Sequence, residues 1–232
     1  MWMLLNYDFL VLSLLACLPP AIVAVLRPDL RRIMAWTALL SLPFALTEPL
    51  FYPDYWTPRF LFDLGPRIGF GIEDFLFVAA LGCGAITAYP TFTGKTFTYD
   101  TMRLRIHRLG PVFFAVVLGV AVSRILAWPL IWTAVILMLL AAAVVAGRRR
   151  DLIPAGLGGG AIYGAMYFLV CLMFGAIYPD AFRTVWHTSG LSDIYVAGVP
   201  AEELAYGAAC GVAAAVCLPF LLDVAYRPRR AG

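Results

Sequence analysis

Seven long apolar segments constrain what this chain can fold into more than any other feature of its sequence. A helix needs about 20 predominantly apolar residues to cross a bilayer. The segments cover Tyr7–Leu26, Ile33–Phe51, Ile72–Phe92, Val112–Trp128, Pro129–Ala146, Gly160–Tyr178 and Ala201–Val224. We therefore predict an all-α integral membrane protein with seven transmembrane helices, located in the cell membrane.

The composition of the 232 residues agrees with this prediction. Hydrophobic residues make up 62% of the chain and charged residues 13%, whereas a soluble domain carries about 25% charged residues. Intrinsic disorder is excluded as well, because it requires low hydrophobicity. The net charge of +3 does not indicate a nucleic-acid partner, because the basic residues lie between the spans.

Lysine and arginine residues are distributed unevenly between the two sides of the membrane. Those that follow the odd-numbered spans are Arg27, Arg31, Arg32, Lys95, Arg103, Arg105, Arg108, Arg148, Arg149, Arg150, Arg227, Arg229 and Arg230. Those left for the other side are Arg59, Arg67, Arg124 and Arg183. The side richer in Lys and Arg is normally cytoplasmic, so we predict an N-terminus outside and a C-terminus in the cytoplasm.

A motif with an aromatic residue and paired acids occurs twice. Trp56 is followed after 17 positions by Glu73-Asp74, and Trp186 is followed after 16 positions by Glu202-Glu203. This repetition predicts two parallel three-helix repeats joined by a linker helix. The predicted parts are residues 1–110 for the first repeat with its cytoplasmic loop, 111–128 for the linker helix and 129–232 for the second repeat.

The four glutamates of the chain, Glu48, Glu73, Glu202 and Glu203, all fall at the outer ends of predicted spans. Carboxylates at helix N-termini can be simple anchors, because the helix dipole favours them there. However, ionisable groups within a membrane commonly mark a functional site. Glu73 and Glu202 each precede an aromatic residue by four positions, Phe77 and Tyr206, which places acid and ring on one helix face.

This arrangement is typical of proton-transfer chemistry on an apolar substrate. Carboxyl groups held near one another in an apolar site keep a proton at neutral pH and can donate it. Aromatic faces can stabilise the cation that results, and a dry cavity protects that cation from water. The residues therefore indicate protonation of an alkene in a lipophilic substrate.

The double motif resembles the membrane-integral lycopene cyclase family, which occurs as two short three-span subunits in some bacteria and as one fused chain in archaea and other organisms. The segment from Pro200 to Tyr206 agrees with the family pattern. The first motif differs, with Gly71 in place of the proline and Asp74 in place of the second glutamate. Glu48 resembles the acidic residue that the family carries near the end of span two.

The resemblance implies a redox-neutral cyclisation of the linear ends of lycopene to β- or ε-ionone rings, with β-rings expected. Glu73 and Glu202 would form the acid/base centre, with Glu203, Asp74 and Glu48 as proton-sharing partners. Phe77, Tyr206, Trp56 and Trp186 are expected to line the substrate cleft, although an interfacial or packing role explains each of them equally well. The expected partners are lycopene and membrane lipid, with self-association or association with other carotenoid enzymes allowed. No cofactor or metal is expected.

A small-solute or proton-coupled transporter is the main alternative, because parallel three-helix repeats are also the plan of small transporters. A retinal photoreceptor would need a lysine in the last span, but Lys95, the only lysine, lies in a loop. The five cysteines lie within apolar runs and are interpreted as small buried residues. The glycine-rich segment at residues 156–160 is interpreted as a flexible start of span six or as a site of close helix packing.

Overall fold

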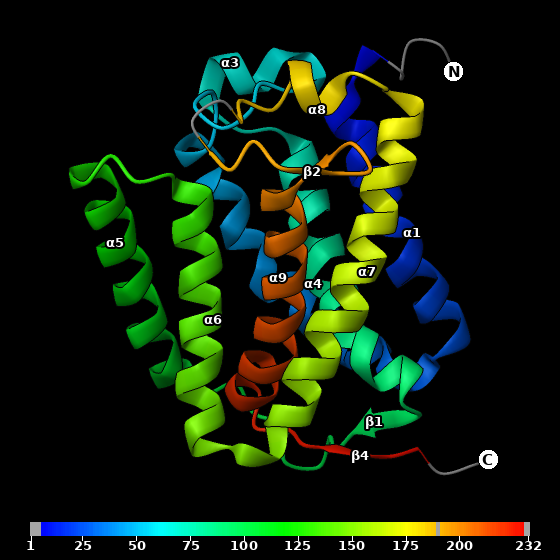
Figure 1. Cartoon of the computed structure of the whole chain (residues 1–232). Helices are drawn as coiled ribbons and strands as arrows, with labels where there is room; N and C mark the ends of the chain where they lie inside the picture. Colours follow the sequence, from blue (N-terminus) through cyan, green and yellow to red (C-terminus); the bar gives the residue numbers. More distant parts are fainter. Residues whose placement is uncertain (1–5, 189–190, 230–232) are drawn as a thin grey trace.

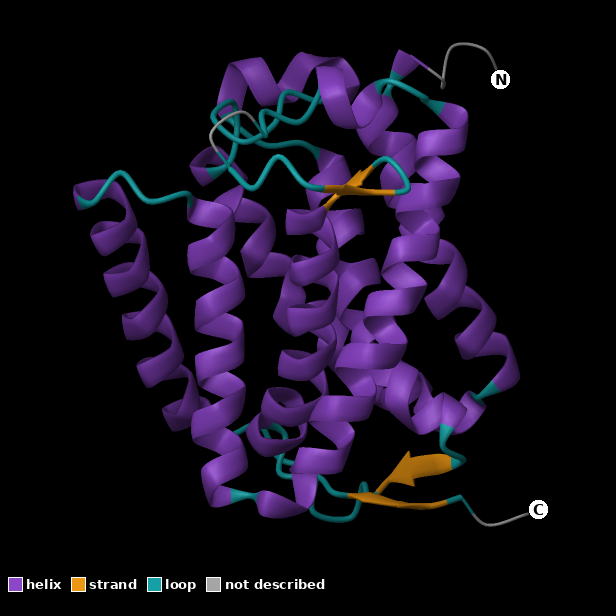
Figure 2. Ribbon diagram, viewed as in Figure 1, coloured by secondary structure: helices purple, strands orange, loops and turns teal. Residues whose placement is uncertain are grey.

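Seven helical segments that are long and apolar enough to cross a membrane run side by side in the computed structural model (Figures 1 and 2). The structure describes residues 6–188 and 191–229. The segments are α1 (Asp8–Leu26), α2 (Arg31–Ser41) with the 3₁₀ helix η3 (Leu42–Leu50), α4 (Ile72–Phe92), α5 (Leu109–Ile125), α6 (Leu130–Arg148), α7 (Ile153–Ile177) and α9 (Ala201–Leu221). The prediction of an all-α protein with seven potential membrane spans is confirmed.

Short elements close the two ends of the bundle (Figure 1). One end, named here the glutamate end because all four glutamates lie there, carries α3 (Leu64–Ile68), α8 (Ala181–Thr184) and the pair β2 (Tyr195–Val196) and β3 (Val199–Pro200). The other end is named here the arginine end, because Arg27, Arg105, Arg108 and Arg149 lie there. At this end β1 (Lys95–Phe97) pairs with β4 (Tyr226–Pro228). The remaining 3₁₀ helices are η2 (Pro28–Leu30), η4 (Leu61–Asp63), η5 (Ile106–Arg108) and η6 (Arg150–Leu152). Arg230, which contributed to the charge argument, lies outside the described residues.

The second span changes helix type part-way along its length. Its α-helical part ends at Ser41, and the nine residues Leu42–Leu50 continue as a 3₁₀ helix. Pro43 and Pro49 lie in this second part and lack the backbone N–H that an α-helix requires. Glu48 is therefore held on a tighter helix than a continuous span over Ile33–Phe51 would provide.

The glycine-rich segment at residues 156–160 lies inside α7, which begins seven residues earlier than the predicted span. A Cβ atom at Gly159 would lie 2.8 Å from the carbonyl oxygen of Gly211 in α9. The backbones of α7 and α9 therefore touch, as small residues allow in membrane helices. The interpretation as close helix packing is confirmed, and the interpretation as a flexible start is wrong.

Helices α4 and α9 are the two central helices and pack against each other. Helices α1 and α2 pack on α4, and α6 and α7 pack on α9. Helix α7 also packs on α1 and α4, whereas α5 packs mainly on α6. The central position of α4 and α9 brings their acidic first turns to the middle of the glutamate end.

Two Arg–Asp pairs at the arginine end have the same local structure. After α1, the guanidinium of Arg27 donates two hydrogen bonds to Asp29, at 2.9 and 2.8 Å. After α6, Arg149 donates in the same way to Asp151, at 2.8 and 2.7 Å. Arg27 has φ −130° and ψ 69°, and Arg149 has φ −128° and ψ 71°. The turn after α1 is therefore repeated after α6.

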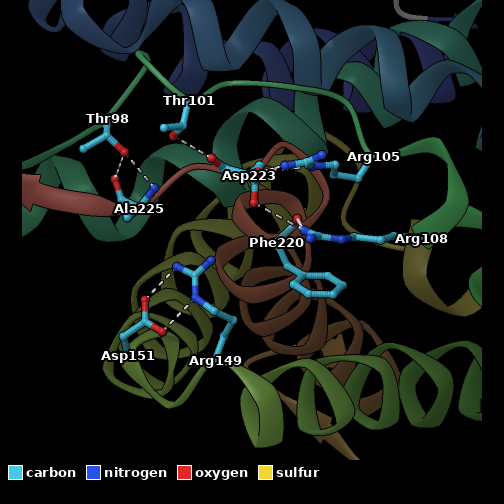
Figure 3. Close-up of polar contacts among 9 residues, drawn as sticks. All are labelled: Thr98, Thr101, Arg105, Arg108, Arg149, Asp151, Phe220, Asp223 and Ala225. Carbon is cyan, nitrogen blue, oxygen red and sulfur yellow. Dashed lines mark hydrogen bonds and ion pairs between the residues drawn. The ribbon is translucent and has the colours of Figure 1, made fainter.

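Loop 98–108 holds the end of α9 in place (Figure 3). The Asp223 carboxylate accepts a hydrogen bond from Arg105 at 2.5 Å and forms an ion pair with Arg108 at 3.6 Å. Arg108 also donates to the carbonyl oxygen of Phe220, one of the carbonyls that a helix C-terminus leaves without an intrahelical donor. The Arg105 guanidinium holds the pKa of Asp223 below its ordinary value.

Candidate active site

The paired acids occupy the first turns of the two central helices. Glu73 and Asp74 are the second and third residues of α4, and Glu202 and Glu203 hold the same positions in α9. A helix N-terminus favours negative charge, but anchors of this kind are normally solvated. Here Glu73 and Glu202 are each 1% exposed, Asp74 2% and Glu203 5%. An anchoring role alone does not explain this burial.

The carboxyl group of Glu73 is held by one of its two oxygens. The backbone N–H of Leu61 donates to Oε1 at 2.5 Å, and Oε2 is buried with no hydrogen-bond partner among the described residues. Gly71 leaves room for this carboxyl, because a Cβ atom there would lie 2.5 Å from Oε2 of Glu73 and 2.7 Å from the ring of Phe60. This contact explains why glycine replaces proline in the first motif.

Glu202 in α9 has the same arrangement. The backbone N–H of Ser192 donates to its Oε1 at 2.8 Å. Its Oε2 is buried and has no hydrogen-bond partner among the described residues. Both helices thus begin with a glutamate that is fixed by a preceding loop and keeps one oxygen free.

Such a carboxyl group is suited to give up a proton. In a neutral carboxylic acid the carbonyl oxygen is the better acceptor, so an amide N–H preferentially bonds to that oxygen. This favours placing the hydrogen of the acid on the other oxygen, which has no partner among the described residues. An ionised carboxylate with one bare oxygen would be costly to bury. The geometry at Glu73 and Glu202 therefore fits a neutral acid with a free O–H.

Glu48 and Asp74 form a second type of carboxyl site. Their carboxyl groups are close enough to interact, and two neighbouring carboxyl groups in a buried site favour one proton shared between them. Asp74 Oδ2 also accepts from the Gly71 N–H at 2.6 Å, which caps α4, and Glu48 Oε1 accepts from Trp56 Nε1 at 2.5 Å. The structure thus brings Glu48 to the start of α4, although it lies 25 positions before Glu73 in the sequence.

Glu203 differs from the other acids because both of its oxygens accept hydrogen bonds. Tyr55 and Trp186 donate to Oε1, at 2.7 and 2.9 Å. Tyr167 of α7 donates to Oε2 at 2.7 Å. Three donors on two oxygens satisfy an ionised carboxylate, in contrast to the arrangement at Glu202 one position earlier.

Trp56 and Trp186 lie opposite each other where two loops pair in antiparallel fashion across the glutamate end. Thr57 N donates to Val185 O at 2.9 Å, and His187 N donates to Tyr55 O at 2.7 Å. The centroids of the two indole rings are 5.1 Å apart, and both side chains are buried. Each indole N–H holds a carboxyl group, so neither tryptophan is a member of a membrane-surface belt.

The two aromatic residues one turn after the glutamates are half-buried. Phe77 packs edge-on against Phe9, with ring centroids 5.7 Å apart. Tyr206 also packs edge-on against Tyr167, with ring centroids 6.4 Å apart. Their predicted position along a substrate cleft remains a prediction.

The donors that hold the acids could not be identified from the sequence. Leu61 and Ser192 act through backbone N–H groups, which no side-chain pattern reveals. Tyr55 and Tyr167 lie 148 and 36 positions from Glu203, too far for local spacing to indicate. Tyr167 carries only a partial signal, because it places a hydroxyl group inside a largely apolar span but Tyr163 does the same.

An apolar groove lies beside this site, between α7 and α9. It has a volume of about 280 Å³. Its lining consists of Gly160, Ala161, Gly164, Ala165, Phe168, Leu204 and Ala208. Its lining reaches Leu204, the residue after Glu203, and includes none of the acidic residues. Such a lining suits a hydrocarbon chain, whether from a lipid or from a carotenoid.

A family model described as lycopene cyclase matches residues 129–221. This part of the chain is similar to the lycopene cyclase family. The match includes α6, α7 and α9, and with them Glu202 and Glu203. The resemblance inferred from the motifs is therefore confirmed. A search of curated proteins and a search of solved structures gave no match.

The match to the lycopene cyclase family model, together with the seven apolar helices, indicates an enzyme of carotenoid cyclisation in a membrane. It gives no support to the transporter alternative.

Proposed function

We propose that the chain is a lycopene β-cyclase that converts the linear ψ-ends of lycopene to β-ionone rings, giving γ-carotene and then β-carotene. One observation carries the proposal. In the segment that matches the lycopene cyclase family, Glu202 is a buried acid with one oxygen fixed by a backbone N–H and the other without a hydrogen-bond partner among residues 6–188 and 191–229.

The proposed reaction begins with proton transfer from a carboxylic acid to the terminal double bond of the ψ-end. The tertiary cation that forms is attacked by the next double bond, and the new carbon–carbon bond closes a six-membered ring. A base then removes a ring proton and restores a double bond. One proton is added and one is lost, so the reaction is redox-neutral and needs no electron carrier.

Glu202 and Glu73 are the proposed proton donors, because each has the geometry of a neutral acid with a free O–H. The neighbouring carboxyl groups of Glu48 and Asp74 are proposed to share a proton and to relay it. Phe77 and Tyr206 are proposed to face the cation, since aromatic rings attract positive charge. Burial of the carboxyl groups would keep water from quenching this cation.

We also propose that the chain consists of two parallel three-helix repeats, residues 1–110 and 129–232, with a linker helix at 111–128. Four features support this proposal: the matched environments of Glu73 and Glu202, the repeated Arg–Asp turn, and the two antiparallel pairings, Trp56 with Trp186 and β1 with β4. A two-fold axis along the membrane normal would produce such antiparallel pairs at both ends. By the positive-inside rule, the arginine end would face the cytoplasm of the cell membrane.

Expression of the full chain in cells that accumulate lycopene tests the proposed function. Chromatography and absorption spectra of the extracted pigments should show lycopene replaced by cyclic carotenes with β-rings. Cells with an empty vector are the control. Unchanged lycopene, with the protein confirmed in the membrane, would contradict the proposal, and ε-rings would contradict the proposed ring type.

A further inference from the structure

Glu203 is surrounded by donors that the proton-donor role does not explain. Trp186 Nε1–H can only donate, and it shares Oε1 with the hydroxyl of Tyr55. The hydroxyl of Tyr167 occupies Oε2. Hydrogen bonds from N–H and O–H groups are shorter and stronger when the acceptor is charged. The surroundings of Glu203 therefore stabilise the ionised form.

Tyr55 keeps its proton in this site. Burial, and then the negative charge of Glu203, raise the pKa of the Tyr55 hydroxyl well above its ordinary value. Tyr55 belongs to the loop that precedes α4, whereas Glu203 belongs to α9. The proposed first repeat thus contributes a donor to a carboxylate of the second.

Adjacent positions on α9 therefore hold two carboxyl groups with different hydrogen-bonding surroundings. Within the part of the chain that the structure describes, Glu202 has one oxygen without a partner, whereas Glu203 has donors on both oxygens. Successive residues of a helix point about 100° apart, so the two groups face different sides of the helix start. An acid beside a base is what a reaction needs that adds one proton and removes another.

Building on the proposed function, we propose that Glu203 is the base that removes the ring proton, and that Tyr55, Tyr167 and Trp186 are positioning residues that keep it ionised. In this step, the C–H bond next to the cation breaks. Its electron pair forms the new ring double bond, and the proton passes to the Glu203 carboxylate. Glu202, which has given its proton to the substrate, is then ionised, and transfer of the proton from Glu203 to Glu202 restores both groups.

Infrared difference spectroscopy of the full chain in lipid vesicles tests the charge of Glu203 without any substrate. The spectrum of the wild type minus that of Glu203→Gln should show the loss of carboxylate bands. The spectrum of the wild type minus that of Glu202→Gln should show the loss of the C=O band of a protonated acid. A protonated-acid band assigned to Glu203 would overturn the proposal.

Tyr167→Phe tests the positioning role even if Glu203→Gln fails to fold. Removing one donor should shift the Glu203 carboxylate bands. Tyr163→Phe is the matched control, because Tyr163 lies one turn earlier in α7 with its ring 6.3 Å from that of Tyr167 and is not a donor to Glu203. Unchanged carboxylate bands in Tyr167→Phe would overturn the positioning role.

Kinetics give a second readout. A hydrogen bond to a charged group is strong enough that Tyr167→Phe should lower kcat about tenfold to a hundredfold, with KM nearly unchanged. Equal kcat values in Tyr167→Phe and the wild type would overturn the proposal. Failure of the wild type to convert lycopene would instead contradict the proposed function, while the infrared spectra would still decide the charge of Glu203.

Discussion

Gly71 illustrates how closely a single position is fitted to the carboxyl group that follows it. Its backbone is extended, with φ −127° and ψ −178°, so the conformation itself does not require glycine. The constraint is steric, because a Cβ atom would meet Oε2 of Glu73 and the ring of Phe60. The oxygen that we propose to carry the reactive proton is therefore the one that a larger residue would displace.

Gly71→Ala should lower both stability and cyclisation. Overpacking of this kind typically costs about 1–3 kcal/mol, and the displaced Glu73 carboxyl would lose its hydrogen bond to the N–H of Leu61. Thermal unfolding in detergent and pigment analysis measure the two effects. Gly110→Ala is the control, because a Cβ atom there has no neighbour within 4 Å. Wild-type stability and activity in Gly71→Ala would refute this account of the position.

The contact between α7 and α9 depends on glycines that face each other. A Cβ atom at Gly211 would lie 2.4 Å from the carbonyl oxygen of Gly159. A backbone atom cannot rotate away as a side chain can, so Gly211→Ala should force the helices apart and destabilise the protein by about 1–3 kcal/mol or more. Unfolding measurements should show this loss, whereas Gly147→Ala in α6, with no neighbour within 4 Å, should be neutral or slightly stabilising.

The stabilisation that the fold gains from the contacts of loop 98–108 with Asp223 at the end of α9 should depend on pH (Figure 3). The hydrogen bond from Arg105 holds the pKa of Asp223 in the folded protein below its ordinary value. A lowered folded pKa means that the ion pair stabilises the fold fully above the unfolded pKa. This stabilisation is lost as the pH falls from about 4 through the folded value.

Asp223→Asn removes the charge and leaves the backbone conformation unstrained. Asp223 has φ 55°, and asparagine also adopts positive φ readily. The difference in melting temperature between wild type and variant should therefore shrink as the pH falls below about 4. Asp54→Asn is the control, because the Asp54–Arg124 ion pair is exposed and should contribute little. A difference that stays constant or grows at low pH would contradict the assigned role of Asp223.

Hydropathy and charge predicted the helices of the chain well, because a bilayer requires long apolar segments whatever their tertiary contacts. The acid pairs were also found in this way, since carboxyl groups are rare in such segments. The change of helix type before Glu48 was missed, because the apolar pattern hides the effect of Pro43 and Pro49. The repeated turn was not predicted either, although its residues, Arg27 with Asp29 and Arg149 with Asp151, have the same spacing in the sequence.

The contacts that distinguish the acids from one another could not be predicted. Glu202 and Glu203 are identical in type and adjacent in sequence. They differ only because loop 191–200 presents a backbone N–H to the first, whereas Tyr55, Tyr167 and Trp186 converge on the second. Such convergence depends on how the two proposed halves pack, which involves the contacts of α4 with α9 and of α7 with α1 and α4 as well as the Trp56–Trp186 and β1–β4 pairings.

The halves should therefore function as separate chains that associate. Residues 1–128 and 129–232, expressed together in lycopene-accumulating cells, should form cyclic carotenes, because the break falls between α5 and α6 and leaves both pairings intact. Each half expressed alone should be inactive, since the second half would lack Tyr55 and the first would lack Glu202 and Glu203. Ring formation by either half alone would contradict a shared site.

The most direct test of proton-initiated cyclisation is pigment analysis of four proteins at equal expression: wild type, Glu202→Gln, Glu73→Gln and Asp54→Asn. Glutamine keeps the acceptor oxygen that Ser192 and Leu61 contact but has no acidic proton to give. We predict cyclic carotenes from the wild type and Asp54→Asn, whose carboxyl is exposed, and unchanged lycopene from Glu202→Gln and Glu73→Gln with the folded proteins present in the membrane. Full cyclisation by folded Glu202→Gln would contradict the account.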